Sequence, residues 1–168
     1  QTVVIQPPLA LLTLASYLIE NGFEIKIVDR RINKESIKKL IEQEDFVSVG
    51  ISLMTGSQIK DGLSLCKQIK EIKNIPIIAG GVHPTFMPKQ TIQNKYIDFA
   101  IKGMAEEGFL ELNNKLINNE KDYSKISGLI YKVDNTIKIN PENYDNFDID
   151  KLPAPAWNLI NVRNSLEK

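Results

Sequence analysis

Hydroxyl side chains gather in the loop from Gly50 to Ser57 of this 168-residue sequence. Ser52, Thr55 and Ser57 can each donate and accept hydrogen bonds, so they suit a polar ligand that lies along a cleft. Ser57 has a plainer explanation, because a serine just before a helix is a common N-cap. Ser52 and Thr55 have no such role and are the stronger candidates for ligand contact.

A second candidate loop begins with Gly80-Gly81 and continues through Val82 and His83. Two glycines after a strand let a ligand approach bare backbone, but they are equally typical of a tight turn, so both interpretations stay open. His83 is the only histidine. Its imidazole could bind cobalt or donate to a ligand amide, although a lone histidine beside a proline is commonly structural. We therefore predict no metal ligand from the protein.

Several classes of site are excluded by missing motifs. The sequence contains no Gly-x-x-x-x-Gly-Lys loop for nucleotide phosphates, and Gln6-Pro7-Pro8 stands where a dinucleotide-binding glycine motif would follow the first strand. A phosphorelay receiver would need an aspartate at the position of Ser52. No Ser/His/Asp set can be assembled around the single histidine.

The amino-acid composition limits which cofactors and partners this chain can bind, and indicates its cellular compartment. Cys66 is the only cysteine, so this chain alone cannot hold a disulfide or an iron–sulfur cluster, and its place on a helical apolar stripe indicates core packing. Lysine plus arginine (21) balances aspartate plus glutamate (21), which leaves no basic field for nucleic acid or a membrane surface. No apolar run reaches the roughly 18 residues of a membrane helix. We expect a cytoplasmic protein that binds neither nucleic acid nor a membrane.

Predicted strands alternate with predicted helices along the sequence, and this order places the candidate loops in the fold. Short apolar runs predict strands at 2–5, 23–29, 46–52, 75–79 and 96–101, and helical periodicity predicts helices at 9–20, 34–43, 57–73, 88–93 and after Gly103. The alternation predicts an α/β fold with a five-stranded parallel sheet and helices on both faces. Ligands of such sheets bind beyond the carboxyl ends of the strands, where the strand order reverses. The loops 6–9, 52–57 and 80–85 are therefore the expected site.

The last fifty residues differ in character. Residues 127–133 and 136–139 flank Asp134-Asn135, which predicts a β-hairpin. A proline-stiffened connector, Leu152 to Trp157, follows, and Trp157 is a candidate anchor on a neighbouring domain. We expect a binding domain at 1–120, and a hairpin with connector at 121–168. The absence of an initiator methionine and of a signal segment favours an excised piece of a longer protein.

Six segments, in order, resemble the N-terminal cobalamin-binding region of B12-dependent radical SAM enzymes. They are Ile5–Pro8, Gly50–Thr55, Gly80–Thr85, Asp98–Gly103, Ile126–Tyr131 and Leu152–Trp157. The resemblance covers nearly the whole chain. It implies a flavodoxin-like domain that holds cobalamin, followed by a radical SAM domain whose Cys-x-x-x-Cys-x-x-Cys triplet holds a 4Fe-4S cluster and S-adenosylmethionine. That triplet is absent here, so the chain would be a catalytically incomplete fragment.

The resemblance also implies roles for individual residues. Ser52 and Thr55 would contact the nucleotide tail of cobalamin, and Gly80 and Gly81 would line its cleft. The full expected set is Gln6, Pro7, Pro8, Ser52, Leu53, Met54, Thr55, Gly80, Gly81, Val82, His83 and Glu106. The Asp-x-His-x-x-Gly motif that places a histidine below cobalt is replaced by the Gln6 loop. The family's Gly-Glu-Gly-Glu appears here as Gly103-Met104-Ala105-Glu106.

The sequence thus favours the cobalamin-binding domain of a radical SAM enzyme, a methyltransferase or an enzyme of a related radical reaction. Two alternatives remain. One is a flavodoxin-like binding or regulatory module without cobalamin, and the other is a small flavin or nucleotide binder.

Overall fold

The computed structural model describes residues 7–30, 36–56, 58–145 and 147–160. It contains two compact units, unit 1 (residues 1–37 and 147–168) and unit 2 (residues 38–146), and each is described by itself. Three expectations lie outside the described residues: the strand at 2–5, the contact at Gln6 and the N-cap at Ser57.

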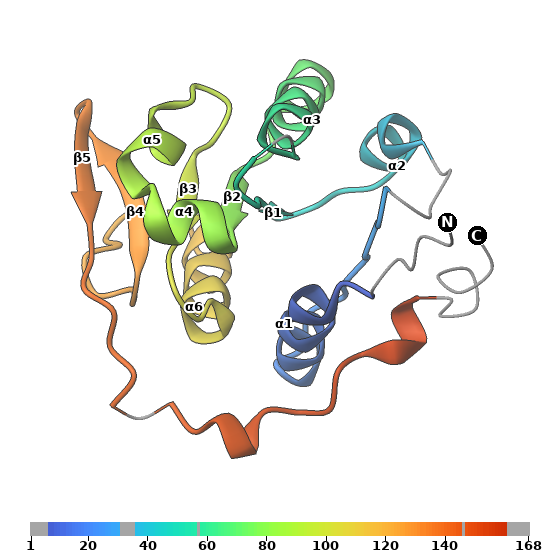
Figure 1. Ribbon diagram of the computed structural model, residues 1–168. Coiled ribbons are helices and arrows are strands. Elements are labelled where there is room, and N and C mark those ends of the chain that lie inside the picture. Colours follow the sequence, from blue (N-terminus) through green and yellow to red (C-terminus); the bar gives the residue numbers. More distant parts are fainter. Residues whose placement is uncertain (1–6, 31–35, 57, 146, 161–168) are drawn as a thin grey trace. The chain divides into compact units, whose positions relative to one another are not determined.

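Unit 2 is built on a five-stranded sheet in the order β1-β2-β3-β4-β5 (Figure 1). The strands are β1 (Val49–Ser52), β2 (Ile77–Gly80), β3 (Phe99–Ile101), β4 (Leu129–Val133) and β5 (Thr136–Ile139). β1, β2 and β3 are parallel, whereas β4 and β5 pair antiparallel. The α/β class is confirmed, but the sheet is not wholly parallel, because the hairpin joins it along β3.

The expected strand at 23–29 is not formed with any described residue. An apolar β-branched run predicts extended backbone, but a strand also needs a hydrogen-bonded neighbour. The strand predicted before it in the sequence, at 2–5, lies outside the described residues. The described strand order also contains no reversal, so the location of a reversal point stays a prediction.

Helices cover both faces of this sheet (Figure 1). α6 (Glu106–Ile117) packs its Leu112 against one face, in a buried cluster with Ile78, Ile101, Ile126, Leu129 and Tyr131. α3 (Gln58–Ile72) lies on the opposite face, where Gly62 approaches Ile51 and Leu53 closely. The central strands β2 and β3 are therefore buried on both sides, as their apolar sequences require.

The remaining helices of this region are short. α2 (Ile37–Gln43) begins where unit 1 gives way to unit 2, and α4 (Val82–Phe86) and α5 (Pro88–Gln93) fill the connection between β2 and β3. The segment around His83 is thus helical rather than the loop expected from its sequence. Pro88 is at the first position of α5, where a missing N–H costs nothing.

The hairpin is confirmed at the predicted turn. Asp134 and Asn135 have φ values of 47° and 62°, the left-handed pair that a two-residue type I′ turn requires. Val133 pairs with Thr136 across the turn, and Ile130 pairs with Ala100 of β3. The hairpin is therefore part of the sheet.

Unit 1 contains α1 (Leu9–Glu20) and two 3-10 turns, η1 (Ile149–Lys151) and η2 (Trp157–Leu159). The Pro8 carbonyl accepts from the backbone N–H groups of Leu11 and Leu12 at the helix start. Gly22, with φ +86°, follows the end of this helix in the left-handed conformation that favours glycine. The N–H of Ala156 donates to the Leu12 carbonyl at 3.1 Å, so the connector contacts this helix. Within the described ranges, no helix is long and apolar enough to cross a membrane.

Replacing Leu112 by alanine should destabilise the protein by about 2–5 kcal/mol, because its fully buried side chain leaves a cavity under the sheet. Urea unfolding measures the change. Ile117→Ala on the same helix is the matched control, since its side chain is 52% exposed and its loss should cost below about 1 kcal/mol. Equal losses for the two variants would contradict the packing of α6.

Candidate functional site

The carboxyl ends of β1 and β2 lie side by side, because Ser52 pairs with Gly80 in the parallel register. Backbone hydrogen bonds continue this pairing beyond the strands. The N–H of Leu53 donates to the Gly80 carbonyl at 2.8 Å, and the N–H of His83 donates to the Leu53 carbonyl at 3.0 Å. The two loops predicted from sequence are therefore fixed together at one edge, which we call the carboxyl edge.

The two glycines at the carboxyl edge, Gly80 and Gly81, have different structural roles. A Cβ on Gly80 would meet no described atom within 4 Å, so the surface above this residue is open backbone. Gly81 has φ +94°, and a Cβ there would lie 3.1 Å from both the Leu53 carbonyl oxygen and the Ser52 hydroxyl. Gly81 is thus required by the turn itself, whereas Gly80 leaves room for a ligand. The turn interpretation is therefore confirmed at Gly81, and ligand contact at Gly80 stays a prediction.

The loop after β3 joins the same edge through Thr85. The Thr85 hydroxyl donates to the Gly81 carbonyl at 2.9 Å and accepts from the N–H of Gly103 at 3.0 Å. This residue was not among the predicted contacts. Its hydroxyl lies four residues after Gly81 on α4, and only the fold brings it to Gly103.

Two buried polar atoms on these elements have no hydrogen-bond partner among the described residues: Nδ1 of His83 and Oε2 of Glu106. The His83 side chain is only 5% exposed. A buried polar atom without a partner is costly, which makes each a candidate for bonding to a ligand. An acceptor carboxylate and an imidazole suit amide groups of a ligand. The described residues contain no group of three or more His, Cys, Asp and Glu side chains that could hold a metal ion.

The other residues predicted to contact a ligand differ in how exposed their side chains are. Met54 is 50% exposed and Val82 is 44% exposed, so both side chains are available to a ligand. Leu53 is 1% exposed and packs inward, so only its backbone reaches the edge. Thr55 is exposed in the loop after β1. Pro7 and Pro8 belong to unit 1, and their contact with a ligand stays a prediction.

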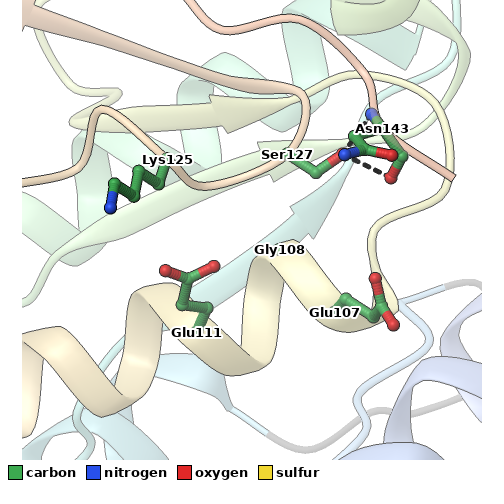
Figure 2. Close-up of a pocket in the computed structure, with 6 residues that line it drawn as sticks. All are labelled: Glu107, Gly108, Glu111, Lys125, Ser127 and Asn143. Atoms are coloured by element: carbon green, nitrogen blue, oxygen red, sulfur yellow. Dashed lines mark hydrogen bonds between the residues drawn. The ribbon is translucent and has the colours of Figure 1, made fainter. Parts of the chain in front are cut away.

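A separate polar cleft of about 160 Å³ opens beside α6 (Figure 2). It is lined by Glu107, Gly108, Glu111, Lys125, Ser127 and Asn143. Two carboxylates against one ammonium group give it no attraction for a phosphodiester. Its volume is also below the roughly 300–1,000 Å³ of ordinary cofactor sites. The cleft is therefore not the candidate cofactor site.

These features, a parallel sheet with an open glycine backbone and hydroxyl groups at its carboxyl edge, define a binding domain of the open α/β class. The B12 binding domain family matches residues 2–113, about two thirds of the chain. The chain belongs to that family, whose ligand is cobalamin. This membership favours the cobalamin hypothesis over the module without a cofactor.

Two curated relatives extend the match over most of the chain. An uncharacterized methyltransferase of Pyrococcus horikoshii is 31% identical over 159 residues, which are 92% of this chain and 34% of that protein. The anaerobic magnesium-protoporphyrin IX monomethyl ester cyclase of a Synechocystis species is 24% identical, over 94% of this chain and 32% of its own length. The chain thus spans about a third of the curated relatives it matches.

Solved structures share the fold. The cobalamin-dependent S-adenosylmethionine radical enzyme OxsB, with aqua-cobalamin and S-adenosylmethionine bound, matches with a TM-score of 0.78 and 21% identity over 97% of this chain and 23% of its own. The radical S-adenosylmethionine methyltransferase TsrM from Kitasatospora setae, with cobalamin and an iron–sulfur cluster bound, matches with a TM-score of 0.72 and 19% identity over 92% of this chain and 29% of its own. At these identities the likeness establishes the B12-domain fold.

Gly81→Ala should lower the free energy of unfolding by about 1–3 kcal/mol, because alanine at φ +94° is strained and its Cβ crowds the Leu53 carbonyl. Gly80→Ala, one residue earlier, should change it by less than about 1 kcal/mol. Urea unfolding of the two variants tests the pair. If Gly80→Ala proved the more damaging change, the assignment of the turn to Gly81 would be wrong.

Cys66 should resist alkylation in the folded protein. Its thiol is buried in α3, and burial raises its pKa to about 11, so little reactive thiolate is present at pH 8. Iodoacetamide should label the folded protein at least about 100-fold more slowly than the urea-unfolded chain. Mass spectrometry follows the labelling, and rapid modification of the folded state would contradict the core role of this residue.

Proposed function

We propose that the carboxyl edge of unit 2 holds cobalamin through Ser52, Thr55, Gly80, Gly81, His83 and Glu106. The observation that carries the proposal is the open backbone at Gly80, set between loops that the parallel register locks together. Bare main chain admits a bulky ligand at close range. Family membership supplies the identity of that ligand.

The residues at the edge would have distinct tasks. The exposed Thr55 and the hydroxyl of Ser52 provide hydrogen bonds for the polar tail, and Gly80 gives it a flat surface. Nδ1 of His83 and Oε2 of Glu106, both without partners among the described residues, would bond to amide groups of the corrin. Bound cobalamin supplies the methyl-group and redox chemistry of its cobalt. The chain orients the group and shields it from water.

We further propose that the chain is the cobalamin domain of a radical SAM methyltransferase or of an enzyme of a related radical reaction. The relatives named above, a methyltransferase among them, are about three times longer than this chain. One cysteine cannot bind a 4Fe-4S cluster, so a further domain would hold the cluster and S-adenosylmethionine. We also propose that the protein is located in the reducing cytoplasm, where a free thiol such as that of Cys66 is stable.

Titration with hydroxocobalamin tests the site. The wild-type protein should bind it saturably, with a shift in the visible spectrum. Gly80→Val should weaken binding by about tenfold or more, because its side chain enters the open space above the backbone. The fold should survive, since valine is favoured in strands.

Lys132→Val is the matched control, because it places the same side chain at an exposed position of β4 in the same sheet. Its affinity should equal that of the wild type, and both variants should melt within a few degrees of it. A folded wild-type protein that leaves the hydroxocobalamin spectrum unchanged would refute the proposal. Quenching of added flavin would point instead to a flavin binder.

A further inference from the structure

The turn after β3 is held by a segment far along the chain. Gly103 and Met104 form this turn, and the N–H of Met104 donates to the Tyr144 hydroxyl at 3.1 Å. That hydroxyl donates in turn to Oε2 of Glu142 at 2.6 Å. Oε1 of the same carboxylate pairs with Nζ of Lys102 at 2.9 Å. We call Lys102, Glu142 and Tyr144 the clamp.

A side chain at position 103 would strain the backbone and displace the tips of the clamp side chains. Gly103 has φ +71°, and a Cβ there would overlap the Tyr144 hydroxyl and lie 2.5 Å from Oε2 of Glu142. Glycine at this position therefore lets the clamp side chains approach the turn closely. The hydrogen bond from Tyr144, and then the one from Lys102, lowers the pKa of Glu142, because both interactions favour the charged carboxylate.

The segment that carries the clamp is itself anchored to the sheet. The N–H of Gly128 donates to the Pro141 carbonyl at 3.0 Å, and the N–H of Lys102 donates to the Gly128 carbonyl at 3.0 Å. Ser127 and Asn143 add two further bonds, drawn in Figure 2. Tyr144 is thus presented to the turn by a fixed backbone.

The other side of the turn belongs to the carboxyl edge. The N–H of Gly103 donates to the Thr85 hydroxyl, which bonds to the carbonyl of Gly81. Glu106, whose Oε2 has no partner among the described residues, begins α6 two residues after Met104. A shift of the Gly103–Met104 turn would therefore move both the Gly81 loop, through Thr85, and the Glu106 carboxylate.

We propose that Tyr144 is a positioning residue for cobalamin, which fixes the Gly103–Met104 turn and so sets the affinity of the carboxyl edge. The inference rests on the proposed function. It adds a part of the chain that the family match does not include, since that match ends at residue 113. The segment around Tyr144 is then a working part of the binding unit.

Tyr144→Phe tests the inference by two readouts on the whole chain. Amide hydrogen exchange at Met104 should accelerate about tenfold in the protein without cofactor, because its acceptor is lost. The dissociation constant for hydroxocobalamin should rise about three- to tenfold, as expected for one hydrogen bond. Tyr123→Phe is the matched control. It removes a hydroxyl from the aromatic cluster with Phe99 and Tyr131, and should leave both readouts within about twofold.

A pair of variants at Glu142 separates positioning from general stability. Glu142→Ala removes the acceptor of the Tyr144 hydroxyl and should weaken binding as Tyr144→Phe does. Glu142→Gln keeps an oxygen acceptor and should restore most of the affinity. This pair also decides the matter should Tyr144→Phe fail to fold.

The outcomes distinguish this inference from the proposed function. If Met104 exchange accelerates while the affinity matches that of Tyr123→Phe, the turn does not set affinity, and the inference is wrong although cobalamin binding stands. Unchanged exchange at Met104 would likewise overturn it. If the wild-type protein binds no hydroxocobalamin, the proposed function fails first and the inference fails with it.

Discussion

The parallel register of β1, β2 and β3 is the constraint on which the candidate site depends. Parallel pairing brings the carboxyl ends of neighbouring strands to one edge, so the residues that follow each strand meet there. Here the register pairs Ser52 with Gly80, and backbone bonds through Leu53 and His83 extend it into the loops. A shift of one residue would turn Ile51 and Ile78 to the wrong faces. The buried core therefore fixes the site.

Three glycines at the carboxyl edge, Gly80, Gly81 and Gly103, have different surroundings and therefore different structural roles. A Cβ on Gly80 would meet open space, whereas Gly81 and Gly103 have positive φ and neighbours that a Cβ would crowd. The first leaves room for a ligand, and the other two give the loops their shape. Hydrogen bonds of Thr85 join the latter two, so the loops after β2 and β3 form one structure. The open residue thus lies beside two rigid turns.

Local pattern predicted much of this fold. Helical periodicity located α3 to within a residue at each end, and Asp134-Asn135 predicted the hairpin turn. The strand at 23–29 was wrong within the described structure, because pairing depends on a distant partner. At the site, the Gly80-Gly81 edge was predictable from a glycine pair after a strand. Thr85 and Tyr144 were not, since their bonds span 18 and 40 residues and leave no short-range signal.

The division of the chain into its two units has a consequence for biosynthesis. Every described strand of unit 2 pairs with the next strand along the chain, so this sheet can form before any residue beyond Ile139 is available. Unit 1 joins α1 to a segment near the other end through the bond from Ala156 to Leu12, across the whole of unit 2. A ribosome must therefore release the later segment before that bond can form. During synthesis, the β1–β5 sheet could therefore form before α1 makes its bond to Ala156.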